Sequence, residues 1–146
     1  MSRNARLEIA PKRIMQTVFG DRGNCYSACI AMMLGIELEQ VPHWAADFPA
    51  NEKADSTKML RAANEWMAQR GLQIVTVVVG GLLPWMMPKG FYIAAGFTSR
   101  GTNHAVIYKD GELWHDPHPE GKGVENVDEI DFILPLSGMP TKEPTP

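Results

Sequence analysis

The sequence has no long apolar run and no excess of basic residues. None of its uncharged apolar stretches approaches the roughly 20 residues that a membrane-spanning helix needs. The 146 residues include 14 Lys and Arg against 17 Asp and Glu, so the net charge is −3. This balance argues against a nucleic-acid-binding protein or a protein of anionic membrane surfaces. We therefore expect one globular domain with no membrane partner, because a chain of this length can bury a sizeable core.

Cysteine is also scarce. Cys25 and Cys29 are the two cysteines of the chain, too few for a disulfide framework. The first sixteen residues carry four Arg and Lys and no apolar core, so they are not typical of a secretory signal. These features predict a cytoplasmic protein with free thiols, and no cofactor is expected.

Two segments have helical patterns. Residues 25–34 are apolar nearly all round, which is typical of a short buried helix, and Gly35 is a natural stop. The apolar positions of a second segment recur at helical spacing: Met59, Ala62, Ala63, Trp66 and Met67. Asp55 or Ser56 is expected to cap the start of this helix, and Gly71 to end it.

After the second helix the hydrophobic period changes. Short β-branched and aromatic runs, divided by Gly, Pro and Asp, predict five strands at residues 72–79, 91–97, 104–109, 112–115 and 130–134. Helices followed by an antiparallel sheet form an α+β layout. We expect a single domain over residues 1–137. Residues 138–146 are proline-rich and charged, and they predict a flexible tail.

Cys25 is the candidate nucleophile. At the start of a helix its thiol would lie near unpaired backbone N–H groups and the positive end of the helix dipole, and both stabilise a thiolate. Cys29 would lie one turn further along, among apolar side chains that favour the neutral thiol. The alternative is that both cysteines are small buried apolar residues, a common situation for free cysteine.

His104 and Asp116 could complete a catalytic triad with Cys25. Cysteine catalysis needs an imidazole to take the thiol proton and a polar group to orient that ring. A two-residue Asp110-Gly111 loop would turn Asp116 to the face opposite His104. A three-residue loop with a bulge at Gly111 would pair the two residues directly. The triad therefore favours the bulged hairpin, unless Asp116 lies beyond the paired strands.

These residues resemble the papain-like cysteine peptidases. The order is Gln16, then Cys25 opening a helix, then His104 in "HAVIY", then Asp116 followed by proline. It is most similar to the leader-peptidase domains of bacteriocin exporters, the C39-like group, and implies a small stand-alone bacterial or phage member. The resemblance implies that Cys25 is the nucleophile, His104 the base, Asp116 the orienting group and Gln16 an oxyanion donor.

Two departures from the family pattern leave other functions open. The exporter peptidases usually have Asp-Cys-Gly at the nucleophile, whereas this chain has Asn24-Cys25-Tyr26, and Gln16 lies nine residues before the cysteine rather than about six. The leading function is a hydrolase that cleaves a peptide or isopeptide bond of a peptide or protein substrate through a thioester. The alternatives are an amidase or acyltransferase with the same Cys–His pair, and a catalytically silent papain-like binding domain.

A metal site is the main rival interpretation. Asp116 with His104, His115 and His118 supplies carboxylate and imidazole ligands, and Cys25 could add a thiolate. Against this, no second close pair of ligands matches a familiar zinc spacing, so no metal is predicted. Four acidic residues near the last strand are interpreted as a solvated turn and strand edge: Glu125, Asp128, Glu129 and Asp131.

Overall fold

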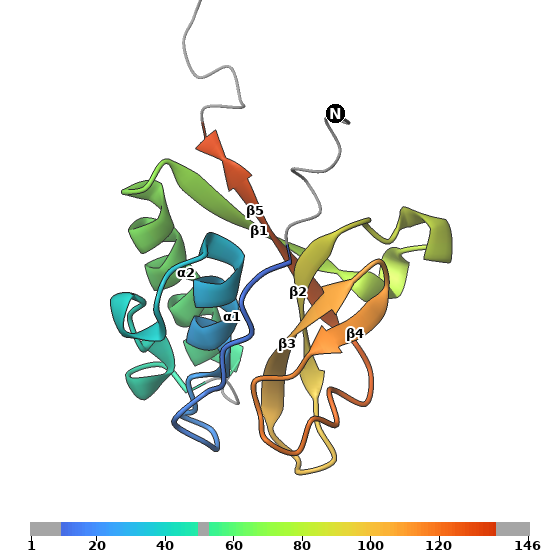
Figure 1. The fold of residues 1–146 in the computed structure, drawn as a ribbon, viewed down its shortest axis with the longest axis horizontal. Coiled ribbons are helices and arrows are strands. Elements are labelled where there is room, and N and C mark those ends of the chain that lie inside the picture. Colours follow the sequence, from blue (N-terminus) through green and yellow to red (C-terminus); the bar gives the residue numbers. More distant parts are fainter. Residues whose placement is uncertain (1–9, 50–52, 137–146) are drawn as a thin grey trace, which may run out of the picture.

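The computed structural model describes residues 10–49 and 53–136. It has the expected α+β layout, with two α-helices and a five-stranded sheet (Figure 1). The helices are α1 (Cys25–Leu34) and α2 (Lys53–Ala68), and the strands are β1 (Leu72–Val78), β2 (Phe91–Phe97), β3 (Asn103–Lys109), β4 (Glu112–His115) and β5 (Glu129–Pro135). The tail predicted at residues 138–146 lies outside the described residues.

The strands lie in the order β1-β5-β2-β3-β4, and each neighbouring pair is antiparallel. The last of the described strands, β5, therefore lies between β1 and β2, so both of its edges are hydrogen-bonded. This order corrects the interpretation of β5 as a strand edge. Strand order depends on pairing between distant segments, which local hydrophobic patterns do not report.

Helix α1 has the predicted bounds. Seven of its ten residues are buried. Burial on most sides agrees with apolar side chains on nearly every face of the helix. Gly35 ends the helix with a left-handed backbone (φ 68°), and the backbone N–H groups of Gly35 and Ile36 bond to the carbonyls of Met32 and Ala31. The predicted glycine stop is confirmed.

Helix α2 begins earlier than predicted. It starts at Lys53, so Asp55 lies inside the first turn and Ser56 in the helix, and neither is the N-cap. The helix dipole favours an acidic residue in the first turn. Asp55 therefore suits this position as well as it would suit the N-cap. Gly71 follows the helix with φ 70°, as its predicted end requires.

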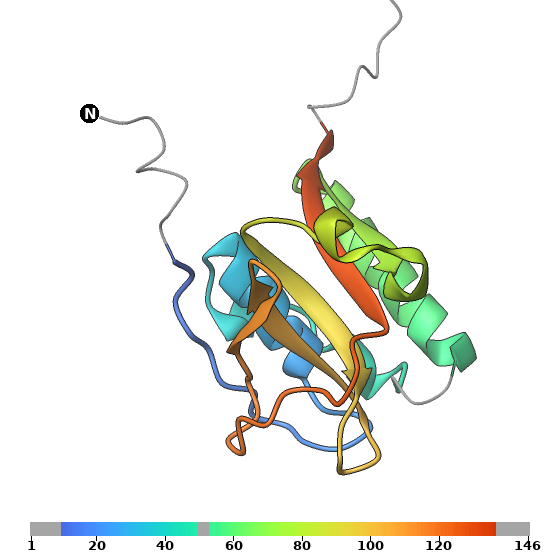
Figure 2. The same ribbon diagram turned by 90° about the vertical axis from the view of Figure 1, so that its right-hand side faces the viewer.

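Both helices pack on one face of the sheet, α1 against β2 and β3 and α2 against β1 (Figures 1 and 2). The main core lies between them and includes Ile30, Met67, Ile93 and Ile107. The connection from β1 to β2 folds back over the opposite face, where Leu82 and Met87 pack against a smaller cluster. Neither described helix has the length and apolar character needed to cross a bilayer.

The hairpin between β3 and β4 carries its bulge at an unexpected position. Lys109 pairs with Glu112 across a two-residue loop, and the positive φ of Asp110 (52°) and Gly111 (89°) is typical of a type I′ turn. The predicted three-residue loop is therefore wrong. The bulge lies further along the hairpin. Trp114 is the extra residue of β4, between the Tyr108–Leu113 and Ile107–His115 pairs.

Candidate active site

The bulge at Trp114 brings Asp116 to His104. Asp116 directly follows β4, and continuing the shifted register would put it opposite Val106. Val106 and His104 are two residues apart on β3, so their side chains share a face. Without the extra residue, Asp116 would lie opposite Ala105 and face the other way. The bulge that corrects the register lies at Trp114 and not at the predicted Gly111, and Asp116 lies just beyond the paired strand, which was the other possibility left open for the triad.

His104 and Asp116 form a buried hydrogen-bonded pair. His104 Nε2 lies 2.6 Å from Asp116 Oδ1, and the two side chains are 4% and 1% exposed. The prediction that these side chains lie within hydrogen-bond reach and that Gly111 has positive φ is confirmed. Since Nε2 faces the carboxylate, Nδ1 is the ring nitrogen left for the thiol of Cys25.

The loop after β4 holds Asp116 in its ionised form. Its Oδ1 also accepts the backbone N–H of His118 (2.8 Å), and its Oδ2 accepts the backbone N–H of Gly123 (2.8 Å). Burial raises the pKa of Asp116, but the hydrogen bonds from His104, His118 and Gly123 outweigh it and lower the pKa below its usual value. The carboxylate can therefore stabilise a charged imidazole beside it.

His104 is held as an imidazolium at neutral pH. Burial lowers its pKa, but hydrogen bonds with Asp116 and Cys25 and the negative charges of both raise it to about 9. Cys25 is the first residue of α1 and is partly exposed. The arrangement suits a thiolate–imidazolium pair, which is the activated form of a catalytic cysteine.

Cys25 and His104 line one cavity of about 380 Å³. Its walls come from the start of α1, the first half of α2 and the strands β2, β3 and β5. A cavity that holds both members of a candidate Cys–His pair is a natural substrate cleft.

Gln16 is not among the residues that line this cleft, but it lies next to one of them. Its side chain is buried, its Nε2 donates to the carbonyl of Val18 (2.9 Å), and its backbone N–H bonds to the carbonyl of Pro117 (3.0 Å). An amide Nε2 has two hydrogens, so one remains for another acceptor. Nε2 lies 3.3 Å from the place where a Cβ would stand on Gly23, which does line the cleft.

Asn24 is the residue that connects Gln16 to the nucleophile. Its Oδ1 accepts the backbone N–H groups of Thr17 and Val18 (both 2.9 Å), and its Nδ2 donates to the Thr17 hydroxyl (2.8 Å). The family resemblance marked Asn24 only as a departure from the usual sequence. The structure gives it a role, because it fastens the 16–18 segment to the start of α1.

Cys29, His115 and His118 are not members of the Cys–His–Asp arrangement, although the His118 ring packs edge-on against the His104 ring with 6.1 Å between the ring centroids. Cys29 is fully buried in the core. His115 Nε2 lies 2.9 Å from the carbonyl of Ile14, and His118 Nδ1 accepts the backbone N–H of Glu120. In the described part of the chain, no group of three or more His, Cys, Asp or Glu is arranged to hold a metal ion.

Sequence reasoning missed Asp131. It was interpreted as solvated, but it is 5% exposed and accepts hydrogen bonds from the hydroxyls of Tyr26 and Thr76, both at 2.7 Å. Burial raises its pKa, and the two hydrogen bonds lower it in part. An aspartate inside the apolar run "IDFIL" was the available signal, because a charged residue there needs partners.

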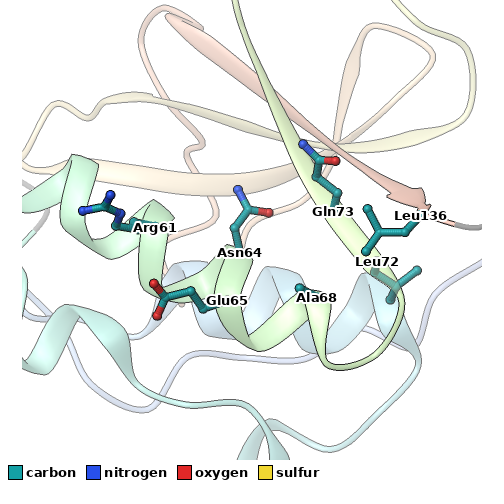
Figure 3. Close-up of a pocket in the computed structure, with 7 residues that line it drawn as sticks. All are labelled: Arg61, Asn64, Glu65, Ala68, Leu72, Gln73 and Leu136. Atoms are coloured by element: carbon teal, nitrogen blue, oxygen red, sulfur yellow. The ribbon is translucent and has the colours of Figure 1, made fainter. Parts of the chain in front are cut away.

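A second cavity, of about 470 Å³, lies between α2, β1 and Leu136, the residue that follows β5 (Figure 3). It is lined by residues such as Arg61, Glu65 and Gln73 and shares no lining residue with the Cys25 cleft. Asn64, at its wall, bonds both backbone groups of Ile74 and so holds α2 against β1. This cavity contains no nucleophile and no histidine among the described residues that line it.

Comparisons of the chain with protein-family models, curated proteins and solved structures found no match. The papain-like relationship therefore stays a prediction, whereas the α+β layout and the geometry around Cys25 are observed.

Proposed function

We propose that this protein is a papain-like cysteine hydrolase that cleaves a peptide or isopeptide bond through a thioester. The observation that supports this most is the placement of His104, which bonds to buried Asp116 on one side and interacts with Cys25 on the other. The three residues then have the roles of nucleophile, general base and acid, and orienting group.

In this mechanism the Cys25 thiolate attacks the carbonyl carbon of the scissile bond. His104 gives its proton to the leaving amine as the C–N bond breaks, and the acyl group stays on Cys25 as a thioester. Neutral His104 then takes a proton from water, and the resulting hydroxide attacks the thioester. The acid leaves, and the thiolate–imidazolium pair is restored.

The oxyanion that forms in each attack needs hydrogen-bond donors. Backbone N–H groups in the first turn of α1 have no partner within the helix, so the N–H of Cys25 is one donor. Gln16 Nε2 is the second donor that we propose, because one of its hydrogens is not used by Val18. Losing one such donor typically costs about 2.7–4 kcal/mol of transition-state stabilisation.

The deciding experiment compares Cys25→Ala with Cys29→Ala on a library of peptide and isopeptide substrates, read by mass spectrometry. We expect Cys25→Ala to lower turnover by roughly 10³-fold or more, because no other group can form the thioester. His104→Ala should be nearly as damaging, since base and nucleophile act as one unit. Asp116→Asn should leave residual activity, because this residue orients and stabilises the imidazolium.

Cys29→Ala is the matched control, because it removes the same thiol one helical turn away from a fully buried position. It should keep turnover while lowering stability. Full activity of Cys25→Ala would overturn the hydrolase proposal. His115→Ala and His118→Ala should be mild here, whereas loss of activity in both and inhibition by a chelator would indicate a metal site instead.

An amidase or acyltransferase would use the same thiolate–imidazolium pair and differs only in what attacks or leaves the thioester. Product analysis separates these reactions, since a transferase yields a new amide or ester in place of the free acid. The reactivity of Cys25 distinguishes the enzyme from a silent binding domain. In a silent domain, Cys25 should react with a thiol-directed probe no faster than an ordinary exposed cysteine.

A further inference from the structure

One wall of the Cys25 cleft is acidic. Glu129 and Asp131 are two residues apart on β5, so their side chains project to the same face of the sheet. The strand pairing places Glu129 beside Ala95 and Asp131 beside Ile93. Both acidic residues line the cleft, and so does Asp128, which directly precedes β5.

Glu129 interacts electrostatically with each of the other two carboxylates. Burial raises the pKa of Glu129, and the negative charges of Asp131 and Asp128 raise it further. Like charges in a partly buried cleft disfavour one another's ionised form. A bound cation would relieve this repulsion, because it interacts favourably with each ionised carboxylate.

Asp131 has more acceptor sites than the two hydroxyls that donate to it can fill. Each of its oxygens accepts one hydroxyl, from Tyr26 and from Thr76, and the two oxygens of a carboxylate offer about four acceptor sites. The two hydroxyls keep the carboxylate in place inside the cleft.

The rest of the lining fits the stem of a long cationic side chain. Among the sixteen described residues that line the cleft, three are acidic, none is Lys or Arg, and His104 is the one that can be positive. Met59, Leu60 and Phe97 add apolar surface. Methylene stems of Lys and Arg pack on such surface while their heads reach polar groups.

We propose that the substrate carries a Lys or Arg side chain next to the bond that Cys25 attacks, and that Asp128, Glu129 and Asp131 bind its charged head. This inference rests on the proposed function, since the acidic wall and the candidate catalytic pair share one cleft. It defines the substrate class as a basic peptide or protein segment.

Binding is measured first, without catalysis, on the full chain carrying Cys25→Ala. The ligand is the peptide amide acetyl-Gly-Lys-Gly-amide, and its reference is the same peptide with norleucine, which keeps the stem and lacks the charge. NMR titration should show roughly tenfold tighter binding of the lysine peptide, weakening as salt is added. Equal affinities for the two peptides would overturn the proposal.

Charge variants locate the binding site. The double variant Asp128→Asn, Glu129→Gln keeps the hydrogen bonds of Asp131 to Tyr26 and Thr76. It should reduce the preference for the lysine peptide by about threefold or more. Glu112→Gln removes the same charge from an exposed position on β4 that does not line the cleft, and should leave the preference unchanged. An equal loss in the control would show that net charge, rather than this wall, attracts the peptide.

Reactive probes separate this proposal from the hydrolase proposal. Chloromethyl ketones of acetyl-Lys and acetyl-norleucine should both alkylate Cys25 in the unmodified protein, the lysyl probe about tenfold faster. Equal rates at a reactive Cys25 would overturn the cation site and leave the nucleophile standing. Selective binding of the lysine peptide with an unreactive Cys25 would support the acidic site and contradict the hydrolase.

Discussion

Cys25 and Cys29 show how position along one helix separates two identical side chains. Cys25 is at the first position and partly exposed, whereas Cys29 is fully buried one turn later. Burial raises the pKa of Cys29 well above its usual value, and the negative charges of Cys25, Asp116 and Asp131 raise it further. Cys29 is therefore held as a neutral thiol.

We expect limited iodoacetamide treatment at neutral pH to modify Cys25 and leave Cys29 intact. The reason is that the thiolate is the reacting form, and Cys25 has both access and an imidazolium neighbour. Peptide mapping by mass spectrometry measures the two sites. The unfolded protein, in which both thiols should react alike, is the control, and preferential labelling of Cys29 in the folded protein would contradict the assignment.

The ionisation of His104 predicts the alkaline limit of the reaction. The imidazolium gives its proton to the leaving amine, so hydrolysis should fall as the pH rises through about 9, the pKa of His104. Alkylation of Cys25 needs the thiolate and no acid, so its rate should not fall over the same range. Parallel pH profiles of turnover and alkylation test this, and a common decline would exclude His104 as the acid.

The same pair contributes to folding stability. The pKa of His104 is raised from 6.5 to about 9, so its contribution is complete below pH 6.5 and is lost as the pH rises through 9. The pKa of Asp116 is lowered, so its contribution is present above pH 3.8 and is lost as the pH falls through the folded value. Urea unfolding at each pH should show both declines, and His104→Gln should remove the alkaline one.

At the scale of elements, the segment before α1 depends on a close approach at Gly23. A Cβ on this residue would lie 2.9 Å from the carbonyl oxygen of Val18 and 3.0 Å from that of Gly20. The first distance is shorter than real Cβ atoms show and the second is at that limit, and both neighbours are backbone atoms. Gly23 therefore lets the loop that carries Gln16 lie against the start of the helix.

We predict that Gly23→Ala displaces this loop and lowers turnover by about 10²-fold, the typical cost of a misplacement of about 1 Å. Stability should fall by about 1–3 kcal/mol, as in other overpacked sites. Gly80→Ala is the control, because its Cβ would meet open space at an ordinary φ. Turnover and thermal melting of both variants test this prediction. Full activity of Gly23→Ala would show that catalysis does not depend on the placement of Gln16.

Local patterns predicted most elements of this chain and missed two of their details. The buried helix, its glycine stop and the five strands follow from apolar periodicity and breakers, which are properties of neighbouring residues. The start of α2 was missed because Asp55 suits a cap and a first turn equally well. The bulge at Trp114 was missed because its position depends on strand pairing rather than on the turn sequence.

At the scale of the whole molecule, one hydrogen-bond network ties α1 to the sheet. The Tyr26 hydroxyl on α1 and the Thr76 hydroxyl on β1 both donate to Asp131 on β5. Burial raises the pKa of Tyr26 well above its usual value, and the negative charge of Asp131 and its hydrogen bond raise it further. The hydroxyl therefore stays protonated and keeps donating.

We expect Tyr26→Phe to lower the free energy of unfolding by about 1–3 kcal/mol, because a buried carboxylate loses one of its donors. Tyr108→Phe, on the opposite face of the sheet, removes the same group without touching Asp131 and should cost less. Denaturant unfolding of both variants measures the difference. A Tyr26→Phe protein as stable as the Tyr108 control would show that the network does not hold the helix.

The sequence by itself determined the α+β layout, the position of Cys25 at a helix start and the candidacy of His104 and Asp116, because these follow from residue types and short-range spacing. Only the tertiary structure decided that Asp116 faces His104, that Asp131 is buried and that the acidic residues share a cleft with the thiol. These facts depend on the bulge in β4 and on β5 lying between β1 and β2. Both arise from contacts between segments far apart in the chain, whose free energy no local pattern contains.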